Sequence, residues 1–230
     1  TVIDLDWLDE ESGKCAIHIC AESGNQPCVS TLILLGAQIN IVDSTLQKRT
    51  ALQYACAGGH IDILTELLLH GADPDAQDHV GNTPLFLACK SSCIEAGCVL
   101  VENYDVDLNH LCWKTLDSIM HVACSSGSLD WVRLIEKYSE ITVLSDLKNK
   151  SGLTPLDLAV SANHTEIVLH AKQTRENLKL RNDRSCAFAL CNNNMHAALS
   201  IAKIGINPNS PVNTSRDSRV GNLPTLFHLA

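Results

Sequence analysis

The chain has 230 residues, of which 45% are hydrophobic and 19% charged, and its formal net charge is −9. This negative charge disfavours a nucleic-acid-binding protein, which needs a basic face. No apolar run reaches the roughly 20 residues of a membrane span, so we expect no direct membrane insertion. Aromatic residues make up only 4%, which suits a core of small helices packed through Ala, Leu, Ile and Val.

The chain opens with an acidic segment, residues 1–12 (TVIDLDWLDEES), which holds Trp7 and Leu8 among its charges. This segment could be an acidic binding motif, or it could cap the folded part that follows. We favour the cap, because the first unit of a stacked array exposes an apolar face that needs a cover.

The clearest structural unit lies in residues 45–77. Thr50 is a good N-cap residue for a first helix, and Gly58-Gly59 allows a tight turn before a second helix. We expect these helices at Ala51–Cys56 and Ile61–Leu69. Gly71 should end the second helix, whose apolar face is predicted to consist of Ile61, Leu64, Leu67 and Leu68.

Similar units recur along the chain at spacings of 32 to 39 residues. Counted from the residue equivalent to Thr50, the copies begin at Cys15, Thr50, Thr83, Ser118, Thr154, Cys186 and Thr225. In the first copy, Leu32, Leu34 and Leu35 should carry the second helix. The third copy has Tyr104 where a glycine is expected, so its second helix should end differently, and the following hairpin should be about two residues longer.

The repeated sequences resemble the ankyrin repeat, whose marker is T-P-L-H-x-A at a period of 33 residues. The residues that carry the resemblance are TALQYAC from Thr50, TPLF from Thr83 and TPLD from Thr154. The resemblance covers almost the whole chain. It implies an all-α solenoid of stacked helix-turn-helix units joined by β-hairpin-like loops. We expect about six repeats over residues 13–209, with the fifth and sixth irregular, and a long loop with a truncated repeat over 210–230.

The eleven cysteines allow two interpretations. Cys56, Cys89 and Cys124 share one slot of the marker, where the family has Ala and where a free Cys packs as a small hydrophobe. A zinc site formed by Cys89, Cys93, Cys98 and Cys112 is the alternative, but no C-x-x-C pair occurs. We therefore expect no metal and no cofactor. Reduced thiols predict a cytoplasmic protein, with the nucleus or the cytosolic face of membranes left open.

The sequence also lacks the common catalytic signatures. It contains no phosphate-binding glycine loop, no H-E-x-x-H motif and no G-x-S-x-G elbow. His18 and His121 share the fourth marker position, where the family's His stabilises a loop by hydrogen bonds. We therefore expect a protein that is not an enzyme.

The resemblance further implies that partners bind at the hairpin tips and at the exposed side of the first helices, which line a concave groove. Carried over position by position, the expected partner-binding residues are Lys14, Glu22, Leu46, Gln47, Arg49, His79, Val80, Asn82, Phe86, Lys90, Trp113, Lys114, Asp117, Lys150, Leu153, Asn182, Asp183 and Asn193. Trp113 and the other apolar members should be the anchors. The lysines and Arg49 form a basic line that could meet an acidic peptide.

We therefore predict a protein-interaction module, a scaffold or adaptor, that belongs to a larger multidomain protein. Its partner would be another protein, met as a peptide segment or a folded domain, and the chain itself would be monomeric. The alternative is the substrate-recruiting region of an enzyme, such as a ubiquitin ligase, with its catalytic domain outside these residues.

Overall fold

The computed structural model describes residues 4–181. Residues 1–168 form one compact unit, and a second unit begins at Leu169. The repeats expected at Cys186 and Thr225 lie outside the described residues. So do three expected binding residues, Asn182, Asp183 and Asn193.

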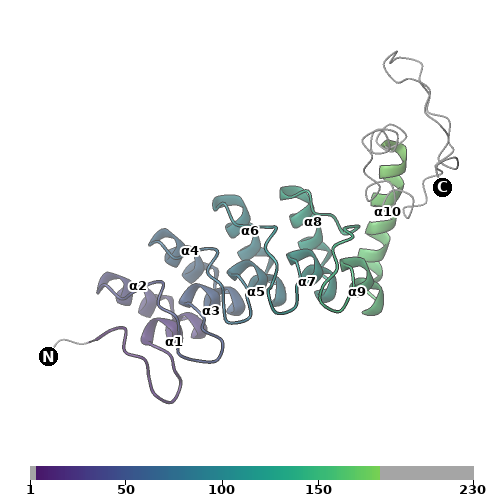
Figure 1. Cartoon of the computed structure of the whole chain (residues 1–230). Coiled ribbons are helices and arrows are strands. Elements are labelled where there is room, and N and C mark those ends of the chain that lie inside the picture. The colour runs from purple at the N-terminus through teal and green to yellow at the C-terminus, as the bar shows by residue number, and fades with distance from the viewer. Residues whose placement is uncertain (1–3, 182–230) are drawn as a thin grey trace, which may run out of the picture. The chain divides into compact units, whose positions relative to one another are not determined.

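Ten helices occur in the described residues, and they form successive pairs (Figure 1). Their bounds are α1 Ala16–Ser23, α2 Gln26–Leu34, α3 Ala51–Gly58, α4 Ile61–Leu69, α5 Pro84–Lys90, α6 Ile94–Asn103, α7 Ile119–Ser126, α8 Leu129–Tyr138, α9 Pro155–Ser161 and α10 Thr165–Arg181. Within residues 4–181 no strand forms, although isolated antiparallel bridges join Val42 to Thr50 and Leu111 to Ser118. The predicted all-α ankyrin solenoid is thus confirmed.

In the first unit, the helices stack in two layers (Figure 1). The first helix of each pair, α1, α3, α5, α7 and α9, packs against the next first helix, and α2, α4, α6 and α8 form the outer layer. The loops that join one pair to the next project from the first-helix layer, away from the outer layer (Figure 1). These loops are the hairpins that the sequence predicts.

The start of each first helix follows from the marker residue. Thr50, Thr83, Ser118 and Thr154 are N-caps whose hydroxyls accept a hydrogen bond from the backbone N–H three residues later. Such a bond satisfies one of the helix's orphan donors. Cys15 holds the same N-cap position in α1. The predicted register is therefore confirmed for all five described copies.

The turn inside each pair needs one residue with left-handed backbone. Gly59 supplies it after α3 at φ +70°, which costs a glycine little. In the third repeat Ser92 adopts φ +58° in the same role, and in the fifth Asn163 adopts φ +60°. The turn geometry is thus kept even where the glycine has been lost.

Two predictions about the outer helices were wrong. In α2 the core residues are Val29 and Leu32, whereas Leu34 is 84% exposed and Leu35 63% exposed. Leu34 and Leu35 lie at the helix end, beyond the part of α2 that faces its neighbours. In α4 the buried face contains Ile63 in place of the half-buried Ile61.

The ends of two outer helices depart from the second repeat. α4 ends as predicted, with Gly71 at φ +90° and its N–H donating to Leu68 O. α6 ends at Tyr104 in extended backbone, as its lack of glycine predicts. α10 continues through the polar stretch that begins at Gln173 and reaches Arg181. None of the helices in the described residues is both long and apolar enough to cross a membrane.

Candidate functional site: the hairpins and the first helices

In α1, α3 and α7 the hairpins are held by one side chain of the first helix, the third residue after the N-cap. In α1 and α7 this residue is histidine. His121 accepts a hydrogen bond from Ser118 N at Nδ1 (3.1 Å), and its Nε2 donates to Leu153 O of the next hairpin (3.2 Å). His18 makes the same pair of bonds, to Cys15 N (3.3 Å) and Ile41 O (3.0 Å). The histidines therefore have the loop-stabilising role that the resemblance implies.

Gln53 performs this task in α3 without an imidazole. Its Oε1 accepts from Thr50 N (2.9 Å), and its Nε2 donates to Ala76 O and to Asn82 O (both 2.9 Å). Gln53 is fully buried. An amide offers an acceptor oxygen and two N–H donors, and a neutral imidazole offers one acceptor and one donor; both can therefore accept from the N-cap backbone and donate to the next hairpin, which is what this position requires.

Phe86 occupies the same position in α5 and can make neither bond. It is 1% exposed, and its ring packs edge-on against His110 at 5.8 Å between centroids. The connection to the next hairpin is reversed here. His110 Nε2 donates to Gly81 O (2.8 Å), and Cys112 Sγ donates to Val80 O (3.0 Å). Phe86 thus lies in the core, where a partner cannot touch it in this conformation.

Neighbouring hairpins are also joined directly through their backbones. Ser44 N donates to Gly13 O (2.8 Å), His79 N to Gln47 O (2.7 Å) and Lys150 N to Thr115 O (2.8 Å). We call the row formed by residues 44–49, 79–82, 113–117 and 150–153 the hairpin ledge. These bonds, with those of Cys112 and His110, link every hairpin of the ledge to the one before it. The ledge is therefore a preformed surface.

Trp113 is the largest exposed apolar side chain on the ledge. It is 56% exposed, and its ring lies nearly perpendicular to that of His79, with 6.0 Å between centroids. The ring rests on Gly81, where an added Cβ would lie 2.3 Å from it. Trp131 of α8, in contrast, is fully buried against Gly97. Trp113 is thus fixed in orientation and still accessible.

The expected basic line is partly balanced by the chain itself. Lys14 Nζ pairs with Glu22 at 2.6 Å and lies 4.4 Å above the ring of Tyr54. Arg49 Nε lies 3.6 Å from the buried Asp78 carboxylate, too far for a hydrogen bond, and it has no other hydrogen-bond partner. The first cation is therefore committed to its neighbours, and the second is only loosely paired.

Lys90 is tied to the same carboxylate through an amide. Its Nζ donates to Asn82 Oδ1 (2.8 Å), and Asn82 Nδ2 donates to Asp78 Oδ2 (2.8 Å). Asn82 is 4% exposed. It therefore positions Lys90 and braces the hairpin, but offers almost no surface of its own. Asp117 has a comparable internal role, because its Oδ1 accepts from Asn149 Nδ2 (2.9 Å).

A buried carboxylate supports the hairpin between α2 and α3. Asp43 accepts from Thr45 N (2.8 Å), Thr45 Oγ1 (2.5 Å) and Tyr54 Oη (2.6 Å). Burial works to raise the pKa of Asp43, but the hydrogen bonds from Thr45 and Tyr54 outweigh it and hold the pKa below its usual value. The same burial, together with Asp43, raises the pKa of Tyr54. This pair stays ionised carboxylate and neutral phenol at neutral pH.

The cysteines do not form a disulfide or a metal cluster in the described part of the chain. The nine that the structure describes are free thiols. Cys56, Cys89 and Cys124 are fully buried, and burial raises the pKa of each, for Cys124 to about 12. No three His, Cys, Asp or Glu side chains described here gather closely enough to hold a metal ion. Cys112, a member of the alternative zinc set, bonds to Val80 O instead.

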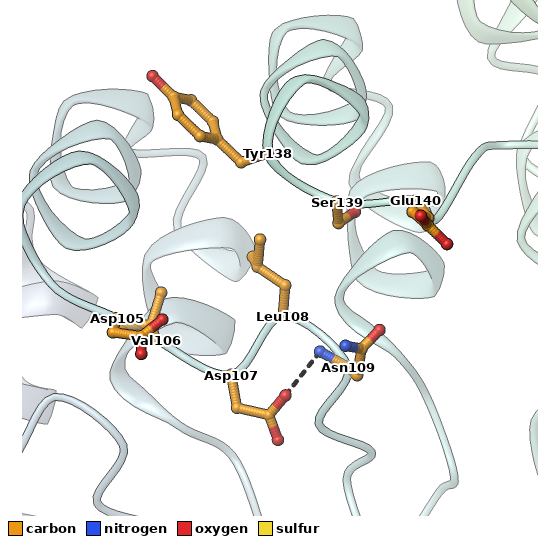
Figure 2. Close-up of a pocket in the computed structure, with 8 residues that line it drawn as sticks. All are labelled: Asp105, Val106, Asp107, Leu108, Asn109, Tyr138, Ser139 and Glu140. Atoms are coloured by element: carbon orange, nitrogen blue, oxygen red, sulfur yellow. Dashed lines mark hydrogen bonds between the residues drawn. The ribbon is translucent and has the colours of Figure 1, made fainter.

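A polar pocket of about 500 Å³ opens between the segment after α6 and the end of α8 (Figure 2). Its lining consists of Asp105, Val106, Asp107, Leu108, Asn109, Tyr138, Ser139 and Glu140. One carboxylate, Asp107, accepts a hydrogen bond from Asn109 N (2.9 Å). The pocket therefore adds three carboxylates to the segments that join outer helices to hairpins, and not to the ledge.

Most of the expected binding residues that the structure describes do lie at the surface. Exposed members are Glu22, Leu46, Gln47, His79, Lys90, Trp113, Lys114, Lys150 and Leu153. Half-buried members are Lys14, Arg49, Val80 and Asp117. The sequence missed Lys48 and Leu116, which are also exposed on the ledge. Leu116 is 44% exposed at φ +57°, in the hairpin whose extra length was the available signal.

Comparison with known proteins agrees with this architecture. Residues 17–112 match the family described as ankyrin repeats, in three copies. Ankyrin repeat domain-containing protein 63 of Mus musculus is 27% identical over 176 residues, which cover 70% of this chain and 35% of that protein. Protein phosphatase 1 regulatory subunit 27 of Mus musculus is 41% identical over 82 residues, 36% of this chain and 51% of that protein.

A third relative is the probable E3 ubiquitin-protein ligase XBOS32 of Oryza sativa. It is 26% identical over 153 residues, which cover 66% of this chain and 29% of that protein. The matches thus span about half or less of these relatives' own lengths. Together with the shared N-cap register and the linked hairpins, they show that residues 17–112 belong to the ankyrin repeat family, and the helices that follow in the first unit continue the same register.

Proposed function

We propose that the chain is a non-catalytic scaffold or adaptor module that binds a peptide segment or folded domain of another protein. Ankyrin repeats are protein-interaction modules, and the proposed site is the hairpin ledge with the exposed side of the first helices. The observation that carries the proposal is Trp113. A tryptophan that is 56% exposed, yet held by His79 and Gly81, has the character of a binding anchor.

The linked hairpins support a rigid mode of binding. Each ledge hairpin bonds to its neighbour through Gln47 O, Val80 O or Thr115 O, so the surface exists before a partner arrives. Little conformational entropy would then be lost on the repeat side when a complex forms. Phe86 and Asn82 are left out of the proposed surface because they are buried.

The test uses two tryptophans of similar exposure. Trp113→Ala removes the ledge anchor, and Trp7→Ala removes a side chain that is 59% exposed in the N-terminal segment. Both variants and the wild type are used to capture proteins from a cytosolic extract, and circular dichroism checks that each is folded. Captured proteins are then purified and their affinities measured.

We expect at least one partner to lose affinity for Trp113→Ala by about 10- to 100-fold and to bind Trp7→Ala as it binds the wild type. Equal affinity of every partner for the two variants would place the binding surface elsewhere and refute the proposal.

The second candidate is the substrate-recruiting region of a ubiquitin ligase, and the relative of that name favours it. It differs in what the rest of the protein would do. The full-length protein would then transfer ubiquitin to a partner captured through Trp113, and Trp113→Ala would stop this transfer. If a partner binds the ledge and is never ubiquitinated by the full-length protein, the ubiquitin-ligase candidate is refuted and only the scaffold function remains.

We further propose a cytoplasmic location. Nine free cysteines among the described residues, four of them exposed in part, support a reducing compartment.

A further inference from the structure

We propose that the hairpin ledge selects an acidic protein segment that carries apolar side chains, an inference that rests on the proposed function. It concerns the chemistry of the partner, which neither the fold nor the relatives specify. The observation behind it is a separation of charge within the first unit. The chain carries −9 in total, yet its ledge is positive.

The exposed positive groups of the ledge are three lysines, whereas Arg49 is half-buried beside Asp78. Lys48, Lys114 and Lys150 are exposed, each on a different hairpin, and none of them makes an ion pair with a described residue. The one carboxylate in the ledge is Asp117, which is half-buried and bonded to Asn149. The carboxylates beneath the ledge, Asp43 and Asp78, are buried. Outward-facing charge on the ledge is therefore almost entirely positive.

The negative charge lies on other surfaces. The segments that join outer helices to hairpins contain Asp73, Asp75, Asp105, Asp107 and Glu140. Three of these carboxylates line the pocket shown in Figure 2. These carboxylates also act on one another, because burial and the charges of the neighbouring Asp73 and Asp107 raise the pKa of Asp75. A negatively charged segment would be repelled by these surfaces and attracted by the ledge.

Apolar side chains alternate with the lysines along the ledge. Leu46 is 91% exposed beside Lys48, Trp113 and Leu116 flank Lys114, and Leu153 follows Lys150. An occupant that matches this order has apolar residues spaced among acidic ones. The loop before α1 sets one limit of the bound segment. Its exposed Glu10 and Glu11 would repel an acidic chain, so the segment should extend over the four hairpins of the ledge only.

Charge complementarity favours a protein segment over nucleic acid or an anionic membrane. Nucleic acid and membrane surfaces both need a dense, continuous basic face, whereas three lysines on three hairpins are sparse. Apolar anchors between the lysines suit side chains of a peptide, which can enter between neighbouring hairpins. Both other occupants are outcomes of the test below.

The test is a selection of binders from a displayed library of random 16-residue peptides, performed on the whole chain. The ledge variant is Lys48→Glu with Lys114→Glu and Lys150→Glu. The matched single pair is Lys114→Glu and Lys137→Glu. Both replace an exposed lysine of the first unit and change the charge equally, but Lys114 lies on the ledge and Lys137 lies on α8 in the outer layer. Selected peptides are synthesised, and their affinities are measured at low and high salt.

We expect the wild type to select peptides rich in Asp and Glu that also contain Leu or aromatic residues. The triple variant should weaken their binding by roughly tenfold or more, Lys114→Glu by a few-fold, and Lys137→Glu by less than about twofold. Salt should weaken binding to the wild type and have less effect on the triple variant.

Three results would overturn the inference. Selected peptides without acidic enrichment, or bound equally by the triple variant, would refute the acidic partner and leave the proposed function standing. A second result is that the chain shows no preference for acidic peptides and binds duplex DNA, or vesicles of phosphatidylcholine and phosphatidylserine, only when the three lysines are present. That result would refute the acidic peptide and make nucleic acid or a membrane the partner of the ledge. A chain that selects no peptide and loses no protein partner on Trp113→Ala would refute the proposed function as well.

Discussion

Replacing Gln53 tests the most specific stabilising contact in the structure. Gln53→Leu keeps a similar volume in a fully buried site but removes both the acceptor and the donor. Thr50 N–H and Ala76 C=O lose the partners that they have in the structure, whereas Asn82 O retains a bond from Asp78 N at 3.0 Å. A buried polar group left unpaired costs about 1–3 kcal/mol, so we expect a loss of about 2–4 kcal/mol.

Gln53→His is the matched control. His18 and His121 make the same two-ended contact at the same position, so this variant should lose at most about 1 kcal/mol. Urea unfolding, followed by helical circular dichroism and tryptophan fluorescence, gives the free energies of unfolding. A His variant as unstable as the Leu variant would show that shape matters here and not the paired hydrogen bonds. A Leu variant within about 1 kcal/mol of the wild type would show that water satisfies both groups.

Three further predictions concern packing and titration. Gly97→Ala should cost about 1–3 kcal/mol in urea unfolding, because the new Cβ would lie 2.3 Å from the Trp131 ring; an unchanged stability would mean that the ring can move. Leu34→Ala should change the free energy of unfolding by less than about 0.5 kcal/mol, whereas Leu67→Ala should cost about 2–5 kcal/mol, because only Leu67 is buried. Similar losses in the two variants would contradict the exposure of Leu34 on α2 and the burial of Leu67 on α4. Burial lowers the pKa of His121 below its usual value near 6.5, so the folded chain resists its protonation, and stability should be fully present above about pH 6.5 and fall as the pH drops below it. His121→Gln keeps the paired hydrogen bonds without the titration, so the loss of stability between pH 7.5 and 5.5 should be smaller than in the wild type; an equal loss would assign it to other groups, such as His18, whose pKa burial also lowers.

The helix starts could be predicted from sequence because their cause is local. An N-cap hydroxyl accepts a hydrogen bond from a backbone N–H three residues away. Thr50 and Thr154 therefore predict where their helices begin, whatever the rest of the fold. The same holds for Gly71, which ends α4 through its own backbone freedom. Period and register followed from these local signals.

The choice of buried residues in the outer helices could not be predicted as well. α2 and α4 contain apolar residues around much of their circumference, so several stripes fit a helical period. Which stripe is buried depends on the position of the neighbouring helix, and that is a tertiary fact. A helical period alone therefore predicts Leu34 in the core and misses Ile63.

At the candidate site, the exposure of Trp113 followed from its place in a hairpin. The internal pairing of Arg49 with Asp78, and of Lys90 with Asn82, did not, because it joins residues whose contact depends on how two repeats stack. Phe86 shows the same limit. It occupies the position that His18 and His121 hold in α1 and α7, but its side chain has no polar atoms and packs in the core.

The stacked cysteines make this chain a reporter of its own local opening. Cys56, Cys89 and Cys124 lie in three successive repeats at one equivalent, fully buried position, and burial raises the pKa of each thiol. A thiol reagent can reach each sulfur only when its own repeat has opened. The rate at which each cysteine of the wild-type protein is labelled, read by mass spectrometry, therefore measures how often that repeat opens, with no substitution introduced.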